Sequence, residues 1–121
     1  SGASQFFVGS VVSYSNSVKH HQLGVESILF ETVGAVSEPV VEQMANGVRE
    51  RLQTDFSIAV SGIAGPGGGS EEKPVGTVVI GVSSAQKTIV KTYHFIGDRS
   101  NVIGRSSNMA LAMLRELVLS N

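Results

Sequence analysis

The chain has 121 residues, of which 41% are hydrophobic and 16% are charged, so its length and composition fit one globular domain over residues 1–121. Nine basic and ten acidic residues give a net charge of −1, which offers no electrostatic footprint for nucleic acid or for an anionic membrane. The absence of cysteine excludes disulfides, thiolate metal sites and a cysteine nucleophile. No apolar run approaches the roughly 20 residues of a membrane span, and a cytoplasmic location fits this composition.

The first expected element is a strand over residues 6–14, a run rich in β-branched and aromatic residues. It begins almost at the first residue. A natural domain usually has sequence before its first strand, so the opening at Ser1 suggests a chain that is truncated at its N-terminus.

Just beyond this strand, Tyr14 and Lys19 place a phenol and an amine close together. Catalytic groups often lie in loops at strand ends, and a lysine can act as a base if burial lowers its pKa. The alternative is a strand cap followed by a solvated lysine. The neighbouring His20 and His21 would face apart on any regular element, so we expect no metal site.

The middle of the chain predicts helices and then strands. A short helix is expected within residues 26–32, and a longer one should begin after Ser37 as N-cap and run to about residue 53. Apolar side chains recur every four residues in the longer helix and predict a stripe against a sheet: Val40, Met44, Val48 and Leu52.

Strands are predicted over residues 56–61, 75–82 and 88–95. A hairpin-sized link joins the last two, so they should be antiparallel neighbours, with the last near a sheet edge. A final helix is expected over residues 100–119, and its predicted buried face consists of Val102, Met109, Ala110, Met113, Leu114 and Leu117.

A glycine-rich loop over residues 62–77 joins the first two of these strands. Five glycines fall between Gly62 and Gly69, which lets the main chain approach a ligand closely and lets successive N–H groups form an anion-binding concavity. The loop matches neither a Walker A motif nor a dinucleotide fingerprint, because no helix follows its glycines. A hairpin connection without a ligand is an equal alternative.

Two arginines, Arg99 and Arg105, stand in the N-terminal half of the last helix. Their guanidinium groups suit carboxylate or phosphate, although Asp98 and Arg99 would also form a local ion pair of little energetic weight. With the loop and the Tyr/Lys cluster, they indicate a site for a small anionic molecule.

Motifs along nearly the whole chain resemble the CinA C-terminal family. The matching motifs are Gly2-Ala3-Ser4, Tyr14-Ser15-Asn16-x-x-Lys19, Leu23-Gly24-Val25, Gly34-Ala35-Val36-Ser37, Gly62-Ile63-Ala64-Gly65-Pro66, Gly68-Gly69, Lys73-Pro74-Val75-Gly76-Thr77 and Gly97-Asp98-Arg99. The resemblance implies a three-layer α/β/α sandwich with a mixed sheet. It also implies hydrolysis of nicotinamide mononucleotide to nicotinate mononucleotide and ammonia, without a cofactor.

The resemblance assigns roles to particular residues. In the family a serine nucleophile lies in an upstream Glu-Ser-Cys-Thr-Gly-Gly motif, and this chain begins after it. Tyr14 and Lys19 would activate that serine, with Lys19 as the base. The residues that would contact the substrate are Ser4, Ser61, Gly62, Ala64 and Gly65, with Arg99 or Arg105 as the clamp for phosphate or carboxylate. Ile103 stands where the family often has a second arginine.

Two other functions remain open from the sequence. One is a catalytically silent domain for nucleotide binding or oligomerisation, and the other is a structural module without a ligand. Because the chain lacks the upstream segment, it should expose apolar area unless a partner covers it. We therefore predict a homodimer or a higher homo-oligomer.

Overall fold

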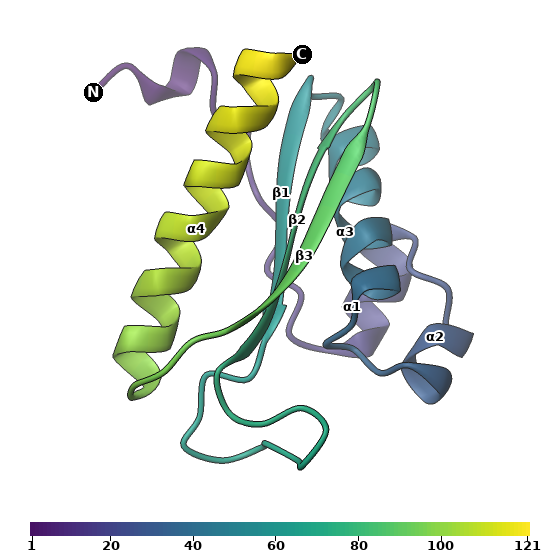
Figure 1. Ribbon diagram of the computed structural model, residues 1–121. Coiled ribbons are helices and arrows are strands. Elements are labelled where there is room, and N and C mark those ends of the chain that lie inside the picture. The colour runs from purple at the N-terminus through teal and green to yellow at the C-terminus, as the bar shows by residue number, and fades with distance from the viewer.

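A central sheet separates one long helix from three shorter ones in the computed structural model, which describes all 121 residues (Figure 1). The elements in chain order are η1 (Ala3–Gln5), α1 (Asn16–Leu23), α2 (Ile28–Thr32), α3 (Glu38–Leu52), β1 (Phe56–Gly62), β2 (Thr77–Ser84), β3 (Thr88–His94) and α4 (Arg99–Ser120). Helix α4 covers one face of the sheet, and α1 and α3 lie over the other. The predicted three-layer α/β/α architecture is confirmed. None of the helices combines the length and apolar character that crossing a membrane requires.

The sheet is antiparallel and has the strand order β1-β2-β3. Ala59 of β1 lies opposite Gly81 of β2, and Ile80 of β2 lies opposite Lys91 of β3. Strand β2 is buried at every position because it has a strand on each side and a helix on each face. Its nearly continuous apolar sequence is typical of such a strand.

Side chains of β2 point alternately into two cores. Val79 belongs to the core beneath α1 and α3, whereas Val78, Ile80 and Val82 belong to the core beneath α4. The predicted stripes of α3 and α4 face these cores. Val40, Met44, Val102, Ala110, Met113 and Leu117 are buried, and Val48, Met109 and Leu114 pack against them.

Helix ends follow local sequence signals. Ser15 is the N-cap of α1, where its hydroxyl accepts a hydrogen bond from the Val18 N–H at 3.1 Å. Asp98 forms a capping box with Asn101 at the start of α4. Ser37 is the N-cap residue of α3 as predicted, but its hydroxyl donates to Gly34 O at 2.6 Å. It therefore stabilises the preceding turn.

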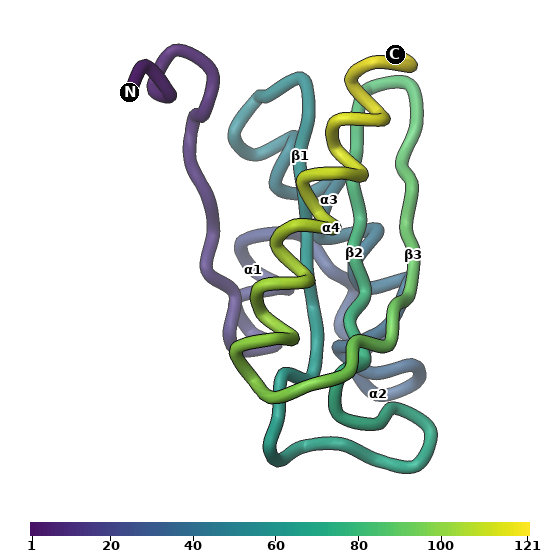
Figure 2. Tube along the Cα trace, turned by 60° about the vertical axis from the view of Figure 1, so that its left-hand side comes forward, coloured from purple at the N-terminus to yellow at the C-terminus, as the bar shows by residue number.

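Residues 6–14 form no strand, contrary to the prediction. From residue 7 to residue 13 the chain is extended and runs in the same direction as β1 (Figure 2), but residues 8–12 make no backbone hydrogen bond. A strand requires a hydrogen-bonded neighbour, and a cavity separates this segment from β1. The mixed sheet expected from the resemblance is therefore absent, since all three paired strands are antiparallel.

Candidate functional site

Lys19 is the most unusual ionisable side chain in the protein. It is only 6% exposed, and its Nζ donates to the backbone oxygen of Ser13 at 2.9 Å and to that of Tyr14 at 3.4 Å. No carboxylate forms an ion pair with it, and desolvation by burial lowers the pKa of Lys19 below its ordinary value of 10.5. The alternative of a solvated lysine is therefore wrong, and the pKa of the side chain is shifted in the direction that proton transfer near neutral pH requires.

The fold places Lys19 by local means. Because Ser15 caps α1 and the chain then turns through a full helical turn, the Lys19 side chain points back toward the carbonyl oxygens of residues 13 and 14. Leu23, one turn further along α1, is buried against α3 and holds the helix in position. Tyr14 is 88% exposed, and its hydroxyl makes no hydrogen bond within the chain. The structure thus brings the Tyr14 backbone, but not its phenol, to Lys19.

The glycine-rich loop leaves several main-chain donors free at the end of β1. The Ile63 N–H donates to Thr77 O at 2.9 Å, but the N–H groups of Ala64 and Gly65 have no acceptor within the protein. Gly65 has a φ of +84°, and a Cβ there would lie 2.5 Å from Val75 Cγ1. Glycine is therefore required at this position for both conformation and space. Unpaired N–H groups of this kind are suited to an anion or an oxyanion.

Hydrogen bonds to distant parts of the chain fix this loop and the end of β1. Arg99 Nη1 donates to Gly65 O at 3.1 Å, and Lys73 Nζ donates to Val33 O at 2.5 Å. Ser61 Oγ donates to Ala35 O at 2.9 Å, which joins β1 to the turn before α3. The hydrogen bond from Lys73 to Val33 O was not among the features predicted from the sequence. Its signal was a lone cation in a loop otherwise rich in glycine, beside the acidic residues 71 and 72.

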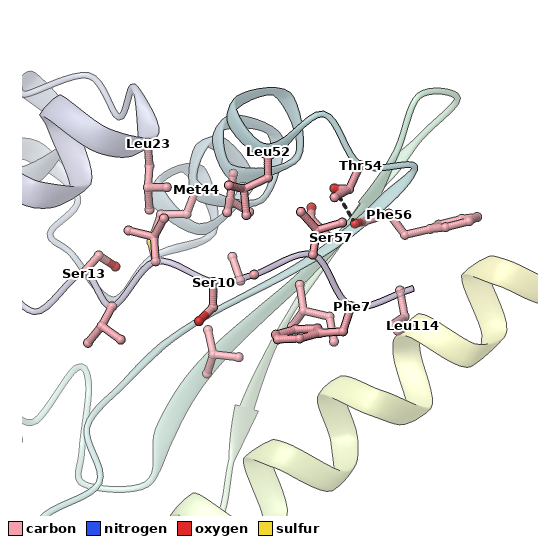
Figure 3. Close-up of a pocket in the computed structure, with 18 of the residues that line it drawn as sticks. Phe7, Ser10, Ser13, Leu23, Met44, Leu52, Thr54, Phe56, Ser57 and Leu114 are labelled. Atoms are coloured by element: carbon pink, nitrogen blue, oxygen red, sulfur yellow. Dashed lines mark hydrogen bonds between the residues drawn. The ribbon is translucent and has the colours of Figure 1, made fainter. Parts of the chain in front are cut away.

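Most of the predicted site residues border one cavity of about 1380 Å³. It lies between the extended N-terminal segment and β1 (Figure 3). Its lining includes Tyr14, Lys19, Ser61, Gly62, Ala64 and Arg99. Lys19, free loop amides and a guanidinium group are thus gathered on one cavity, although they come from α1, the glycine loop and α4.

Three predicted site residues lie elsewhere. Ser4 is in η1, at the opposite end of the domain from the glycine loop in both views (Figures 1 and 2). Arg105 is exposed on α4 and does not line the cavity. Gly65 is buried behind the lining, where its carbonyl binds Arg99. Arg99 is thus the arginine that the fold joins to the loop.

The sequence matches the family model described as CinA C-terminal domain over residues 1–118. The chain belongs to the CinA C-terminal domain family. It is 51% identical over 116 residues to a CinA-like protein of Parasynechococcus marenigrum, and 49% identical over 118 residues to one of Fervidobacterium nodosum. These matches cover 96% and 98% of this chain but only 27% and 29% of the two relatives.

Solved structures of CinA proteins share the fold. The competence/damage inducible protein CihA from Agrobacterium tumefaciens superposes with a TM-score of 0.85 at 38% identity, and the match covers 88% of this chain and 66% of that one. A CinA superfamily protein from Klebsiella pneumoniae 700603 gives a TM-score of 0.86 at 32% identity, with coverages of 92% and 69%. The chain therefore corresponds to part of a longer CinA-type polypeptide in each comparison.

Proposed function

We propose that this CinA domain carries the base, the oxyanion donors and the phosphate-binding arginine of a nicotinamide mononucleotide amidohydrolase. The reaction would convert the carboxamide to a carboxylate and release ammonia. The observation that carries this proposal is Lys19, a buried amine without a counter-ion that lines the same cavity as the glycine loop. Burial without a partner is costly for an ammonium group, so a function in proton transfer accounts for its position.

The nucleophile in this proposal is a serine from the family's Glu-Ser-Cys-Thr-Gly-Gly motif, outside residues 1–121. Its hydroxyl attacks the carboxamide carbon while the unprotonated amine of Lys19 accepts the hydroxyl proton. The C–N bond then breaks, and Lys19 returns the proton to the departing ammonia. Water hydrolyses the resulting ester by the same proton route, which restores the serine and yields the carboxylate.

The loop and Arg99 supply the electrostatic part of the mechanism. Gly62 and Ala64 border the cavity, and their N–H groups would stabilise the oxyanion of the tetrahedral intermediate, where one such donor contributes about 3 kcal/mol to the transition state. Arg99 uses one N–H on Gly65 O, and the remaining N–H groups of a guanidinium fork are available for the nucleotide phosphate.

The proposal is tested by ammonia release from nicotinamide mononucleotide, using this chain extended by an upstream segment that carries the serine motif. Lys19→Met should abolish turnover, and Lys87→Met, at an exposed lysine in the β2–β3 turn, should leave it unchanged. The rate of the unsubstituted protein should rise with pH as Lys19 loses its proton. Full activity of Lys19→Met would remove the lysine from the mechanism.

The second candidate function is a silent domain that binds nucleotide or assembles into homo-oligomers. Large apolar side chains at the N-terminus favour association, since Phe6 and Val12 are 79% and 75% exposed. For this function, nicotinamide mononucleotide should raise the melting temperature of the protein without any ammonia release, because a ligand of the native state stabilises it. Sedimentation equilibrium measures the assembly independently.

A further inference from the structure

The outer part of the glycine-rich loop has no hydrogen bonds of its own. Residues 66–69 neither donate nor accept a hydrogen bond within the protein, and three of these four residues are glycine. A segment of this kind has many accessible conformations, and ordering it has a large entropic cost. The position of the loop therefore depends on what holds the two limbs on either side of this segment.

The first limb, which leaves β1, is held by the sheet and by α4. The Ile63 N–H donates to Thr77 O at 2.9 Å, and Arg99 Nη1 donates to Gly65 O at 3.1 Å. Ala64, with its free N–H group, lies between these two attachments.

The return limb, residues 70–75, is held by Lys73. The Ser70 N–H donates to Lys73 O at 2.9 Å, and the Lys73 N–H donates to Ser70 Oγ at 3.0 Å, so the backbone forms a tight turn. The half-buried side chain of Lys73 then reaches a residue 40 positions away, where Nζ donates to Val33 O at 2.5 Å. This bond joins the return limb to the turn between α2 and α3, which lies at the same end of the domain in both views (Figures 1 and 2).

The turn that accepts this bond is itself firmly attached. The three consecutive carbonyl oxygens of residues 33–35 all accept hydrogen bonds from side chains. Ser37 Oγ donates to the second at 2.6 Å, and Ser61 Oγ of β1 donates to the third at 2.9 Å. Gly34 has a φ of +82°, and a Cβ there would lie 3.3 Å from Lys73 Nζ, so glycine leaves room for the ammonium group. The turn is thus a fixed point that joins the start of α3, the end of β1 and the glycine loop.

Val75 connects the return limb to the first limb. It lies two residues after Lys73, and the ring of the intervening Pro74 fixes φ and stiffens the connection. A Cβ on Gly65 would lie 2.5 Å from Val75 Cγ1, and a Cβ on Gly69 would lie 2.7 Å from the Val75 nitrogen. Val75 therefore packs closely against both glycines, and a shift of the return limb would displace Gly65.

We propose that Lys73 is a positioning residue, which fixes the return limb to residues 33–35 and thereby holds the free N–H group of Ala64 in place. The inference rests on the proposed function, in which that N–H group stabilises an oxyanion. Lys73 does not line the cavity and so acts through the loop. An oxyanion donor acts in the transition state, and a misplacement of about 1 Å can lower a rate about 100-fold. Loss of the Lys73 bond should therefore lower kcat more than it changes KM.

The kinetic test uses this chain extended by the segment that carries the serine motif, with nicotinamide mononucleotide as substrate. Lys73→Met removes the donor and keeps most of the stem, whereas Lys73→Arg keeps the charge and N–H donors. Lys73→Met should lower kcat about 10- to 100-fold, while KM changes less than about threefold. Lys73→Arg should recover most of the lost kcat. Lys87→Met, which removes an exposed lysine far from the loop, should change neither constant.

Amide nitrogen relaxation, measured by NMR on residues 1–121, tests the attachment of the loop without any catalytic activity. In Lys73→Met the order parameters of residues 70–75 should fall from about 0.85 to below about 0.6, and that of Gly65 should also fall. Lys73→Arg and Lys87→Met should keep the original values. All three variants should keep the urea midpoint of the unsubstituted protein, because both lysines lie outside the two cores.

Two results overturn the proposal. If Lys73→Met leaves the order parameters unchanged, the bond to Val33 O does not hold the return limb. If Lys73→Met loosens the loop but kcat stays the same, with or without a rise in KM, the limb does not position an oxyanion donor. Failure of the proposed function is distinct, since the unsubstituted extended protein would then release no ammonia and the order parameters alone would decide whether Lys73 holds the loop.

Discussion

Replacement of Gly47 by alanine tests the packing that positions Lys19. Gly47 lies inside α3, and a Cβ there would lie 1.8 Å from the backbone oxygen of Leu23 at the end of α1. An ordinary contact needs about 3.4 Å, so α1 would have to move away by roughly 1.6 Å. A carbonyl oxygen cannot rotate out of the way as a side chain can.

The expected effect opposes the intrinsic preference of the helix. Alanine is better than glycine inside a helix by about 1 kcal/mol, whereas overpacking of this severity costs about 3 kcal/mol. We therefore expect Gly47→Ala to lower the free energy of unfolding by about 2 kcal/mol, measured by urea denaturation. The displacement of α1 should also reduce any activity that depends on Lys19.

Gly104→Ala is the matched control. Gly104 lies inside α4, is exposed, and would have no heavy atom within 4 Å of an added Cβ. The same substitution should raise the free energy of unfolding there by about 0.5–1 kcal/mol. Opposite signs for the two variants are the result that the packing requires. If Gly47→Ala instead stabilises the protein, the end of α1 does not pack closely against Gly47 of α3.

Three further predictions concern the site and its supports. Burial lowers the pKa of Lys19, so the unfolded chain binds more protons than the native one between the native pKa and 10.5, and native stability should rise with pH through that window. Lys19→Met should therefore have a higher free energy of unfolding in urea than the unsubstituted protein at pH 7. The difference between the two free energies should shrink as the pH approaches 10.5. Gly76 has a φ of +96°, and its Cβ would lie 2.1 Å from Phe95 O, so Gly76→Ala should cost about 3 kcal/mol or more by the same assay. Arg99→Ala removes the donor to Gly65 O; it should raise the KM for a phosphate-bearing substrate at least tenfold and change that for the dephosphorylated nucleoside much less.

Much of the architecture could be predicted from local patterns. Helix α3 follows from a Ser37 start signal and a four-residue apolar repeat, and the β2–β3 hairpin follows from two β-branched runs with a short link. The glycine loop lies at the end of β1, as the sequence predicts. These features depend on interactions between residues close in sequence, which is why they can be read from it.

Features that depend on residues far apart in the chain could not be predicted in this way. The sequence of residues 6–14 is that of a strand, but a strand needs a hydrogen-bonded neighbour, and β1 lies across a cavity from it. Lys19 is a candidate base from its position after that run, yet the sequence leaves a solvated lysine open there as well, and only the folded chain makes the side chain 6% exposed. The motif containing Ser4 does not indicate that η1 lies at the end of the domain opposite the glycine loop. Propensity and spacing are local properties, whereas burial, pKa and strand pairing depend on what the fold brings alongside.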